Sequence, residues 1–351
     1  MALGRVALLV DSHTHPRDFN QSYKGTFESE TKAMLLNGVG TAIAMPNTDP
    51  PLVTAAAIGE ARNRAKGRIY CDLGFYFGTQ GYNTIDFYRV LPFVKGLKVY
   101  ANTTTGNLHL SDSALVERVV EAWPVAKPIL FHAEGAGLLE SIFDLGFKHG
   151  KKIHICHVSL AEEVRVIKEA KERGLPVTAE VCPHHLLFTE NDLPKLGGYG
   201  RMKPELATTR DLEALWEGVR TKIIDVIATD HAPHSEEEKA SSNPPFGVIG
   251  EPTFPVVWKL FHDRGLTLNR LFEMMRYAPA RIFDIQLPNL SEMYVDLDEE
   301  YTFERSAVLS KAGRSPYEGM EVRGRIRQVF LRGYEVVRDG QVIGPPRGEV
   351  I

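Results

Sequence analysis

Histidine, aspartate and lysine side chains recur where short apolar runs of this sequence end. The first run leads into His13 and His15, which are two residues apart and therefore point to the same side of an extended strand. Two neutral imidazoles on one side can grip a single Zn²⁺ ion. The pair predicts a metal site, and further candidate ligands stand at or near the ends of later runs: Lys98, His132, His157 and Asp230.

Lys98 is unusual in such a set, because an ammonium group would repel a metal ion. One interpretation is a surface lysine whose stem lies along apolar side chains. The alternative is carboxylation of the amine by CO₂, which would replace the positive charge by an anion. Such an anion could bridge two zinc ions that share one hydroxide.

The apolar runs themselves predict the elements that position these side chains. Most successive runs start ~25–35 residues apart, the length of a βα unit, and helix-like stretches such as residues 161–173 lie between them. The sequence therefore predicts an α/β fold, a closed (β/α)8 TIM-type barrel with its chemistry at the carboxyl ends of the strands. An open, doubly wound sheet is the competing interpretation. The predicted strands are residues 5–10, 41–45, 69–75, 96–100, 128–131, 152–156, 176–181 and 223–228.

The pattern changes after residue 228. A polar segment rich in Pro and Gly, residues 235–250, predicts a loop, and residues 255–264 and 268–277 predict helices. From residue 294 onward the chain is strand-like. We expect a barrel over residues 1–290 and a small β-rich extension over residues 291–351 that packs near the N-terminus. The predicted strands of the extension are residues 293–296, 307–309, 326–331 and 335–338.

Composition excludes several classes of function. The 351 residues carry a net charge of −4, so no basic excess indicates nucleic-acid binding. No apolar run is long enough to cross a membrane, and the first residues lack the apolar core of a signal peptide. Three cysteines, an odd and sparse set, favour a reducing cytoplasmic setting and a metal role over disulfides.

Five motifs considered together resemble the amidohydrolase superfamily and, within it, the dihydroorotases. The resemblance extends to residues 174–178, 183–186 and 315–319, and so covers nearly the whole chain. The five motifs are Asp11-x-His13-x-His15-x-Arg17, Met45-Pro46-Asn47-Thr48, Gly96-Leu97-Lys98-Val99-Tyr100, His154-Ile155-Cys156-His157-Val158 and Thr229-Asp230-His231-Ala232-Pro233-His234.

The resemblance implies a dinuclear zinc centre. His13, His15 and Asp230 would hold one Zn²⁺, His132 and His157 the other, and carboxylated Lys98 would bridge them. The reaction it implies is the reversible cyclisation of N-carbamoyl-L-aspartate to L-dihydroorotate in de novo pyrimidine (UMP) synthesis, with Asp230 as the catalytic group that transfers the proton.

The resemblance also implies how the substrate is bound. Arg17 and Asn47 would hold its carboxylate, for which a guanidinium fork is well suited. His234 would add a hydrogen bond, and Thr104 would lie on a loop that closes over the ligand.

Two positions depart from the family pattern. Lys203 stands where a substrate-binding arginine is usual, and it supplies charge without a bidentate fork. Gly247, a candidate for backbone contact with the substrate, lies in a segment (residues 246–253) that differs from the usual Gly-Leu-Glu-Thr.

Several polar residues beside the expected ligands allow two interpretations. Asp11, Cys156 and Glu180 could orient ligands or pack in the core, or they could hold a third zinc ion. His184 and His185 are interpreted as structural.

Two other functions compete with this one. A different cyclic amidohydrolase, an allantoinase or hydantoinase, would share the metal ligands, but Arg17 with Asn47 favours a ring that bears a carboxylate. An inactive dihydroorotase-like partner of aspartate transcarbamoylase would be expected to have lost ligands that this chain keeps. By resemblance we also expect a homodimer and a possible association with aspartate transcarbamoylase.

Overall fold

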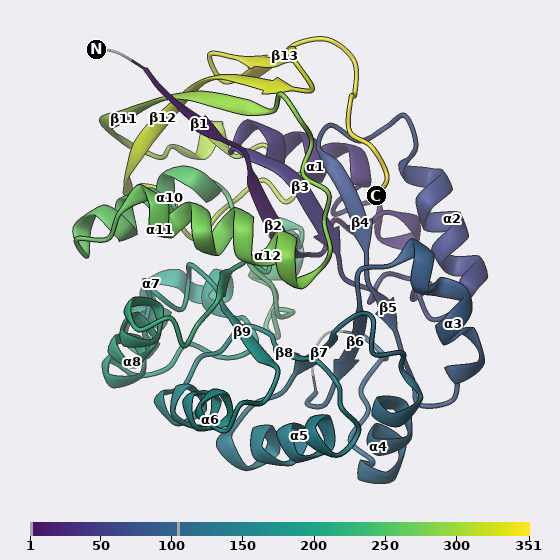
Figure 1. The fold of residues 1–351 in the computed structure, drawn as a ribbon. Helices are drawn as coiled ribbons and strands as arrows, with labels where there is room; N and C mark the ends of the chain where they lie inside the picture. Colours follow the sequence, from purple (N-terminus) through teal and green to yellow (C-terminus); the bar gives the residue numbers. More distant parts are fainter. Residues whose placement is uncertain (1–2, 104–105) are drawn as a thin grey trace.

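The computed structural model describes residues 3–103 and 106–351 and has a parallel β-barrel at its centre (Figure 1). Hydrogen bonds join its strands in two parallel sheets, ordered β2-β3-β4 and β10-β9-β8-β7-β6-β5. Each strand is almost wholly buried, as a barrel strand covered on both faces must be. The barrel strands are β2 (Leu9–Thr14), β3 (Val39–Ala44), β4 (Asp72–Phe75), β5 (Phe77–Gly78), β6 (Leu97–Tyr100), β7 (Ile129–His132), β8 (Ile153–Ile155), β9 (Val177–Val181) and β10 (Val226–Ile227).

Two connections close these sheets into one barrel. Only Tyr76 separates β4 from β5, and its N–H donates to the Ala44 carbonyl on β3, so the two labels mark one interrupted strand. At the other seam Thr14, at the end of β2, forms a parallel bridge with His231, beyond β10. With β4 and β5 counted together, the described residues form the eight barrel strands that the sequence predicts, and the (β/α)8 prediction is confirmed.

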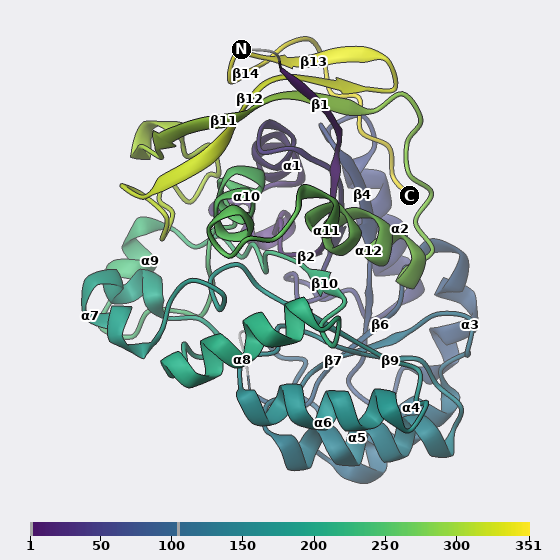
Figure 2. The same ribbon diagram turned by 60° about the vertical axis from the view of Figure 1, so that its left-hand side comes forward.

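Helices surround the barrel and cover its strands (Figures 1 and 2). Side-chain caps fix where several of them begin. At the start of α8, the Thr208 hydroxyl accepts from the Asp211 N–H, and the Asp211 carboxylate accepts from the Thr208 N–H. The helices are α1 (Phe27–Leu36), α2 (Ala55–Ala65), α3 (Phe87–Val90), α4 (Ser113–Ala122), α5 (Ala136–Lys148), α6 (Ala161–Glu172), α7 (Leu193–Leu196), α8 (Thr209–Arg220), α9 (Glu236–Ala240), α10 (Thr253–Asp263), α11 (Leu268–Phe272), the π-helical turn η6 (Glu273–Tyr277) and α12 (Ala278–Ile282).

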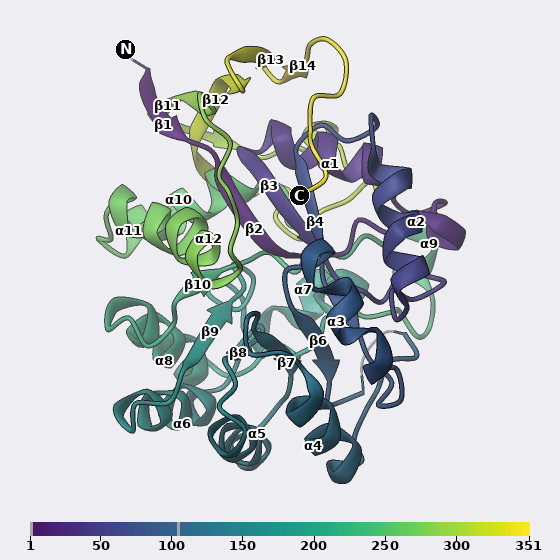
Figure 3. The same ribbon diagram turned by 45° about the vertical axis from the view of Figure 1, so that its right-hand side comes forward.

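An antiparallel sheet, ordered β1-β11-β12-β13-β14, lies beside the barrel (Figures 2 and 3). β1 (Gly4–Ala7) pairs with β11 (Glu292–Thr302), so both ends of the chain contribute to it. The remaining strands are β12 (Glu321–Leu331), β13 (Tyr334–Arg338) and β14 (Gln341–Val342). The last residues then run along the barrel, where Val350 bridges to Leu73 of β4.

Two strand predictions were wrong. The run 5–10 is not one strand: residues 4–7 are half-exposed and pair with β11, whereas residues 9–14 are buried in the barrel. Residues 307–309 form no strand, because the backbone N–H groups of Leu309 and Ser310 donate to the buried carboxylate of Glu251 instead of to a neighbouring strand. In the part of the chain that the structure describes, no helix is long and apolar enough to span a membrane.

Candidate active site

A pocket opens where the barrel strands end, and the predicted ligands gather there. Five of the six line it and come from the ends of four strands, which agrees with the general location of chemistry in such barrels. The sixth, Lys98, is not among the lining residues. The pocket is lined by His13, His15, Arg17, Asn47, Tyr100, His132, His157, Lys203, Asp230, Ala232, Phe246 and Gly247.

His13 lies between two carboxylates. Its Nδ1 contacts Glu180, and its Nε2 is 3.2 Å from Oδ1 of Asp230. Burial alone would lower the pKa of His13, but the two carboxylates outweigh it and raise the pKa to about 10. The Nε2 of His15 is 2.9 Å from the same Asp230 oxygen, and ligand atoms of His13, His15 and Asp230 lie within 4.8 Å of one another. These three side chains can hold one cation.

His132 and His157 form a second group of donors. Nδ1 of His132 is 2.9 Å from Nε2 of His157, while His157 Nδ1 is buried without a hydrogen-bond partner among the described residues. Burial lowers the pKa of both imidazoles, so that both are neutral with lone pairs available to a metal. This pair fits a metal site because the lone pairs of neutral imidazoles converge there.

Lys98, on β6, is fully buried. Its Nζ is 3.0 Å from the Cys156 sulfur and 5.0 Å from the centroid of the Tyr100 ring. Among the described residues no carboxylate forms an ion pair with this ammonium, and an uncompensated buried charge is costly. Carboxylation of the amine would remove that charge, so the surroundings of Lys98 fit the modified form better than the free amine.

The three candidate ligands of a third metal are placed differently. Cys156 and Glu180 form a donor group with His13, all within 4.8 Å. Asp11 instead accepts hydrogen bonds from the Thr229 hydroxyl at 2.5 Å and from two backbone N–H groups, those of Thr229 and His13. Burial raises the pKa of Asp11 to about 6. Its oxygens brace the loop after β10 rather than face the donor group.

Three functional residues adopt a left-handed backbone conformation, which directs their side chains into the pocket. Arg17, His157 and Asp230 have φ angles of 66°, 36° and 51°. Such angles cost about 1–3 kcal/mol each for residues other than glycine and are concentrated at functional sites. The surrounding hydrogen bonds stabilise these strained conformations at the strand ends.

The residues expected to bind substrate surround the same opening. Arg17 is buried, donates from Nε to the Pro233 carbonyl at 3.2 Å and from Nη2 to His234 at 3.1 Å. Burial and the neighbouring cations lower the pKa of His234 to about 2, so it accepts from Arg17 as a neutral ring. His234 thus lies behind Arg17 and does not line the pocket. Asn47 Oδ1 is 2.7 Å from His15 Nδ1.

Lys203 and Gly247 line the same pocket. Lys203 Nζ is 3.4 Å from a carboxylate oxygen of Glu134, whose other oxygen is 3.2 Å from Nε2 of His132. Gly247 has a φ of 150°, and a Cβ at this position would lie 2.6 Å from the Ala232 carbonyl oxygen, so only glycine fits. Thr104 lies outside the described residues.

Sequence reasoning did not assign a role to three residues of this site: Tyr100, Glu134 and Phe246. The signal for Glu134 was available, since it follows His132 by two residues at the end of the same strand and points the same way. Phe246 and Tyr100 gave no such signal, because aromatic residues most often pack in cores.

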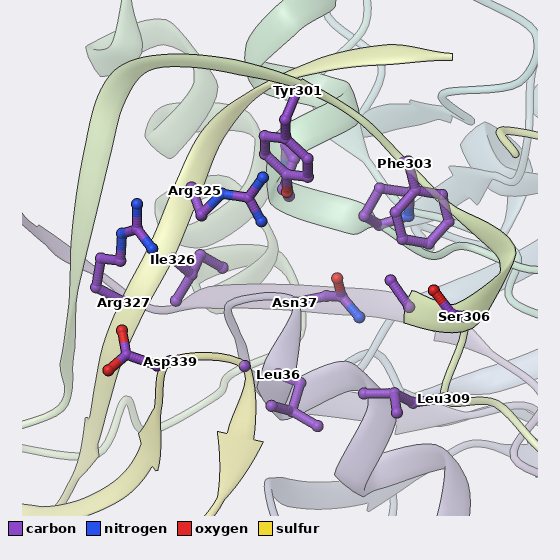
Figure 4. A pocket seen from close by; sticks show the side chains of 14 residues that line it. Leu36, Asn37, Tyr301, Phe303, Ser306, Leu309, Arg325, Ile326, Arg327 and Asp339 are labelled. Atoms are coloured by element: carbon purple, nitrogen blue, oxygen red, sulfur yellow. The ribbon is translucent and has the colours of Figure 1, made fainter. Parts of the chain in front are cut away.

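A second cavity lies away from these ligands, between the C-terminal sheet and helices α1 and α10 (Figure 4). Its lining includes Arg325 and Arg327 of β12, and both guanidinium groups pair with Glu299. No histidine or cysteine is among its described lining residues. This second cavity is therefore not a candidate for the metal centre.

Comparison with known proteins agrees with this geometry. The family model described as the amidohydrolase family matches residues 7–290. Amidohydrolases generally depend on metal ions, and the chain contains groups of side chains that could bind them. Among solved structures, the L-hydantoinase of Arthrobacter aurescens has a TM-score of 0.91 at 23% identity and covers 98% of this chain and 88% of its own. The inactive dihydroorotase-like domain of a Chaetomium thermophilum CAD-like protein has a TM-score of 0.83 at 24% identity, with 100% of both chains covered. At these identities the likeness shows the fold.

Relatives found by sequence identify the family more narrowly than the solved structures do. The multifunctional protein pyr1-3 of Dictyostelium discoideum is 37% identical over 97% of this chain, but this chain spans only 15% of that relative's length. The dihydroorotase of Staphylococcus epidermidis is 35% identical over 93% of this chain and 86% of its own length. With the match over residues 7–290, these similarities show that the chain belongs to the amidohydrolase family, among the dihydroorotases.

Proposed function

We propose that this protein is an active dihydroorotase, a hydrolase of cyclic amide C–N bonds. It would interconvert N-carbamoyl-L-aspartate and L-dihydroorotate, a step of de novo pyrimidine synthesis. The observation that carries the proposal is the convergence of His13, His15 and Asp230 with the pair His132 and His157 around one pocket. The same pocket contains Arg17, a guanidinium group suited to the carboxylate of the substrate.

The residues present fit a dinuclear zinc centre. His13, His15 and Asp230 would hold one Zn²⁺, and His132 and His157 the other, with carboxylated Lys98 between them. Bound zinc ions supply two kinds of chemistry here, a lowered pKa for water and polarisation of the amide carbonyl. A third zinc ion at Cys156 and Glu180 is part of the proposal, whereas the hydrogen bonds of Asp11 favour a bracing role for that carboxylate.

Asp230 is placed to move the proton. Its Oδ1 lies 2.9 Å from His15 and 3.2 Å from His13. Burial raises the pKa of Asp230, but these imidazoles more than offset the effect and keep the carboxyl ionised. In hydrolysis it would accept a proton from the attacking water as the C–O bond forms. It would return that proton to the ring nitrogen as the C–N bond breaks.

Arg17 and Asn47 would orient the substrate through its carboxylate. The position of Arg17 is fixed by the Pro233 carbonyl and by His234, so His234 would act on the substrate through Arg17. Lys203 would add positive charge to the same pocket, and its ion pair with Glu134 would partly neutralise that charge. This arrangement favours a ring that bears a carboxylate over hydantoin or allantoin, which lack one.

A substrate panel tests the proposal. Protein loaded with zinc in bicarbonate buffer is expected to hydrolyse L-dihydroorotate and to form it from N-carbamoyl-L-aspartate, with a kcat/KM at least 100-fold (about 3 kcal/mol) above that for hydantoin or allantoin. The chelated protein is the control and should be inactive. Preference for an uncharged ring would indicate the other cyclic amidohydrolases, and no turnover of any substrate would indicate the inactive partner.

The cellular compartment, the oligomeric state and the protein partners of this chain stay predictions. The three cysteines are buried and free, which supports the reducing, cytoplasmic setting expected from the sequence. A homodimer and an association with aspartate transcarbamoylase rest on the family resemblance, and light scattering with and without that enzyme would test both.

A further inference from the structure

A second cluster of metal-binding side chains lies just beyond the end of β9. Cys182, His184 and His185 each place one ligand atom within 4.8 Å of the others. Their exposed fractions are 0%, 1% and 3%, so none of them is a surface group. No member of this cluster belongs to the dinuclear centre or to the group formed by His13, Cys156 and Glu180.

The hydrogen bond of His185 fixes its protonation. Its Nε2 is 3.1 Å from the Pro204 carbonyl oxygen, which can only accept, so Nε2 carries the hydrogen and donates it. Nδ1 is therefore a bare lone pair. It is buried without a hydrogen-bond partner in the described part of the chain. Histidines that bind metals typically show this arrangement, in which one nitrogen donates to a carbonyl and the other faces the ion.

Without a bound ion, the burial of His184 is energetically unfavourable. Both of its ring nitrogens are buried and neither has a partner among the described residues. Its ring centroid is 4.3 Å from that of His185. A buried polar group without a partner is costly, and native structures contain few of them. A bound cation would satisfy one ring nitrogen of His184 and Nδ1 of His185 at the same time.

The electrostatic surroundings leave the donors ready for a cation. Burial lowers the pKa of His185 to about 4 and that of His184 well below its usual value, so both rings are neutral at physiological pH. Burial also raises the pKa of the Cys182 thiol. A bound cation would reverse that effect, since a coordinating thiol loses its proton.

We propose that Cys182, His184 and His185 form a mononuclear Zn²⁺ site, separate from the catalytic pair. One thiolate and two imidazoles are typical zinc ligands, and three protein ligands leave one position for water or a further group. On binding, the S–H bond of Cys182 breaks, its sulfur bonds to zinc, and the proton passes to solvent. The two histidines then act as ligands, a role that the sequence did not indicate.

The site would stabilise one wall of the catalytic pocket. The ion would link the end of β9, through Cys182, to the turn at residues 184–185. The Nε2–H of His185 in turn donates to the carbonyl of Pro204, the neighbour of the pocket residue Lys203. Loss of this zinc is therefore expected to loosen the Lys203 wall while the dinuclear ligands stay in place.

Cobalt substitution tests the proposal, because thiolate-to-Co²⁺ charge transfer gives a near-ultraviolet band that imidazole and carboxylate ligands do not. The three cysteines provide matched variants: Cys182→Ser removes the proposed ligand, Cys156→Ser removes the thiol of the other donor group, and Cys71→Ser removes a buried thiol outside both. Because Cys156 is itself proposed to bind a third ion, the comparison is made in the Cys156→Ser background. The cobalt-loaded Cys156→Ser protein is expected to show a band that persists when Cys71→Ser is added and is lost when Cys182→Ser is added. A band absent from Cys156→Ser, or unchanged when Cys182→Ser is added to it, overturns the proposal.

Metal content gives a second readout that does not depend on activity. After dialysis against zinc, Cys182→Ser is expected to hold one zinc ion fewer per chain than Cys71→Ser. If circular dichroism shows that Cys182→Ser does not fold, His184→Asn carries the test, because it keeps the thiol and should also lose one zinc. Equal zinc content in His184→Asn and wild type would refute the site.

Discussion

Nδ1 of His132, the last residue of β7, lies 2.9 Å from Nε2 of His157, which follows β8, although 24 residues separate the two in the chain. Both rings are buried and neutral, so at most one hydrogen can lie between the two nitrogens. The same two lone pairs, aimed at one point, are what a metal ion requires. Several expected outcomes depend on this convergence.

His157→Asn should weaken zinc binding. It removes one of the two imidazoles proposed for the second ion. Even the loss of an outer hydrogen-bond partner costs about 10–100-fold in metal affinity, so the loss of a ligand should exceed that. Equilibrium dialysis with zinc measures it, and His262→Asn, on an exposed histidine, is the matched control. Unchanged zinc stoichiometry in His157→Asn would remove this residue from the centre.

Lys98→Ala should lose both metal and activity, because it removes the proposed bridging anion. Short carboxylic acids such as acetate or propionate, added at high concentration, should restore part of the activity by occupying the vacated space. Lys152→Ala, at an exposed lysine, should behave as wild type with or without the acid. If the acid has no effect, or if mass spectrometry of the intact native protein lacks the added CO₂, Lys98 is no bridge.

Asp230→Asn should reduce turnover far more than substrate affinity. The amide keeps the shape of the side chain but cannot accept the proton, and general acid–base catalysis contributes about 100- to 10,000-fold. A fall of that size in kcat, with KM changed only a few-fold, is expected from steady-state kinetics. Asp263→Asn, on an exposed aspartate, is the control. A variant with near-normal kcat would show that another group moves the proton.

Arg17→Lys should raise KM and leave kcat nearly unchanged. Lysine keeps the charge but loses the fork that a carboxylate accepts, and a charge-assisted hydrogen bond is worth about 1.5–3 kcal/mol. That corresponds to a KM roughly 10- to 100-fold higher for L-dihydroorotate. Arg64→Lys, at a largely exposed arginine, should not change it. An equal loss in kcat alone would place Arg17 in the chemical step instead.

Glu251 should make stability depend on pH. Burial raises the pKa of this carboxyl from 4.5 to about 7, although the Ser310 N–H and His231 oppose the shift. A raised pKa means that the folded protein binds the proton more tightly than the unfolded chain. The stabilising contribution is thus complete below pH 4.5 and is lost as the pH rises through 7.

Urea unfolding of wild type and Glu251→Gln across this range measures the effect. The amide does not titrate, so the unfolding free energy of wild type relative to the variant should fall between pH 4.5 and 7, on the order of 3 kcal/mol. Glu60→Gln, at an exposed glutamate, is the control and should give a flat difference. A difference that rises with pH would contradict the predicted protonation of Glu251.

The eight-stranded barrel and the dihydroorotase family could be predicted from the sequence, although the bounds of the first strand could not. Short apolar runs at regular spacing are a local property, and so is the pair His13 and His15 on one side of a strand. Parallel strands of one barrel must end on one side, so polar residues after each run are brought together without knowledge of any contact. For that reason the separate sequence positions of Lys98, His132 and Asp230 already indicated a shared site.

Only the tertiary structure decided which partners these residues meet. Glu180 on His13, Lys203 on Glu134 and the Pro204 carbonyl on His185 are contacts between separate segments of the chain. Their geometry depends on strand register and loop conformation. The division of residues 4–14 between two sheets has the same origin, because hydrophobic spacing cannot tell which sheet a strand will join. Periodicity records which face is buried, whereas the neighbour on that face is set by long-range packing of the whole barrel.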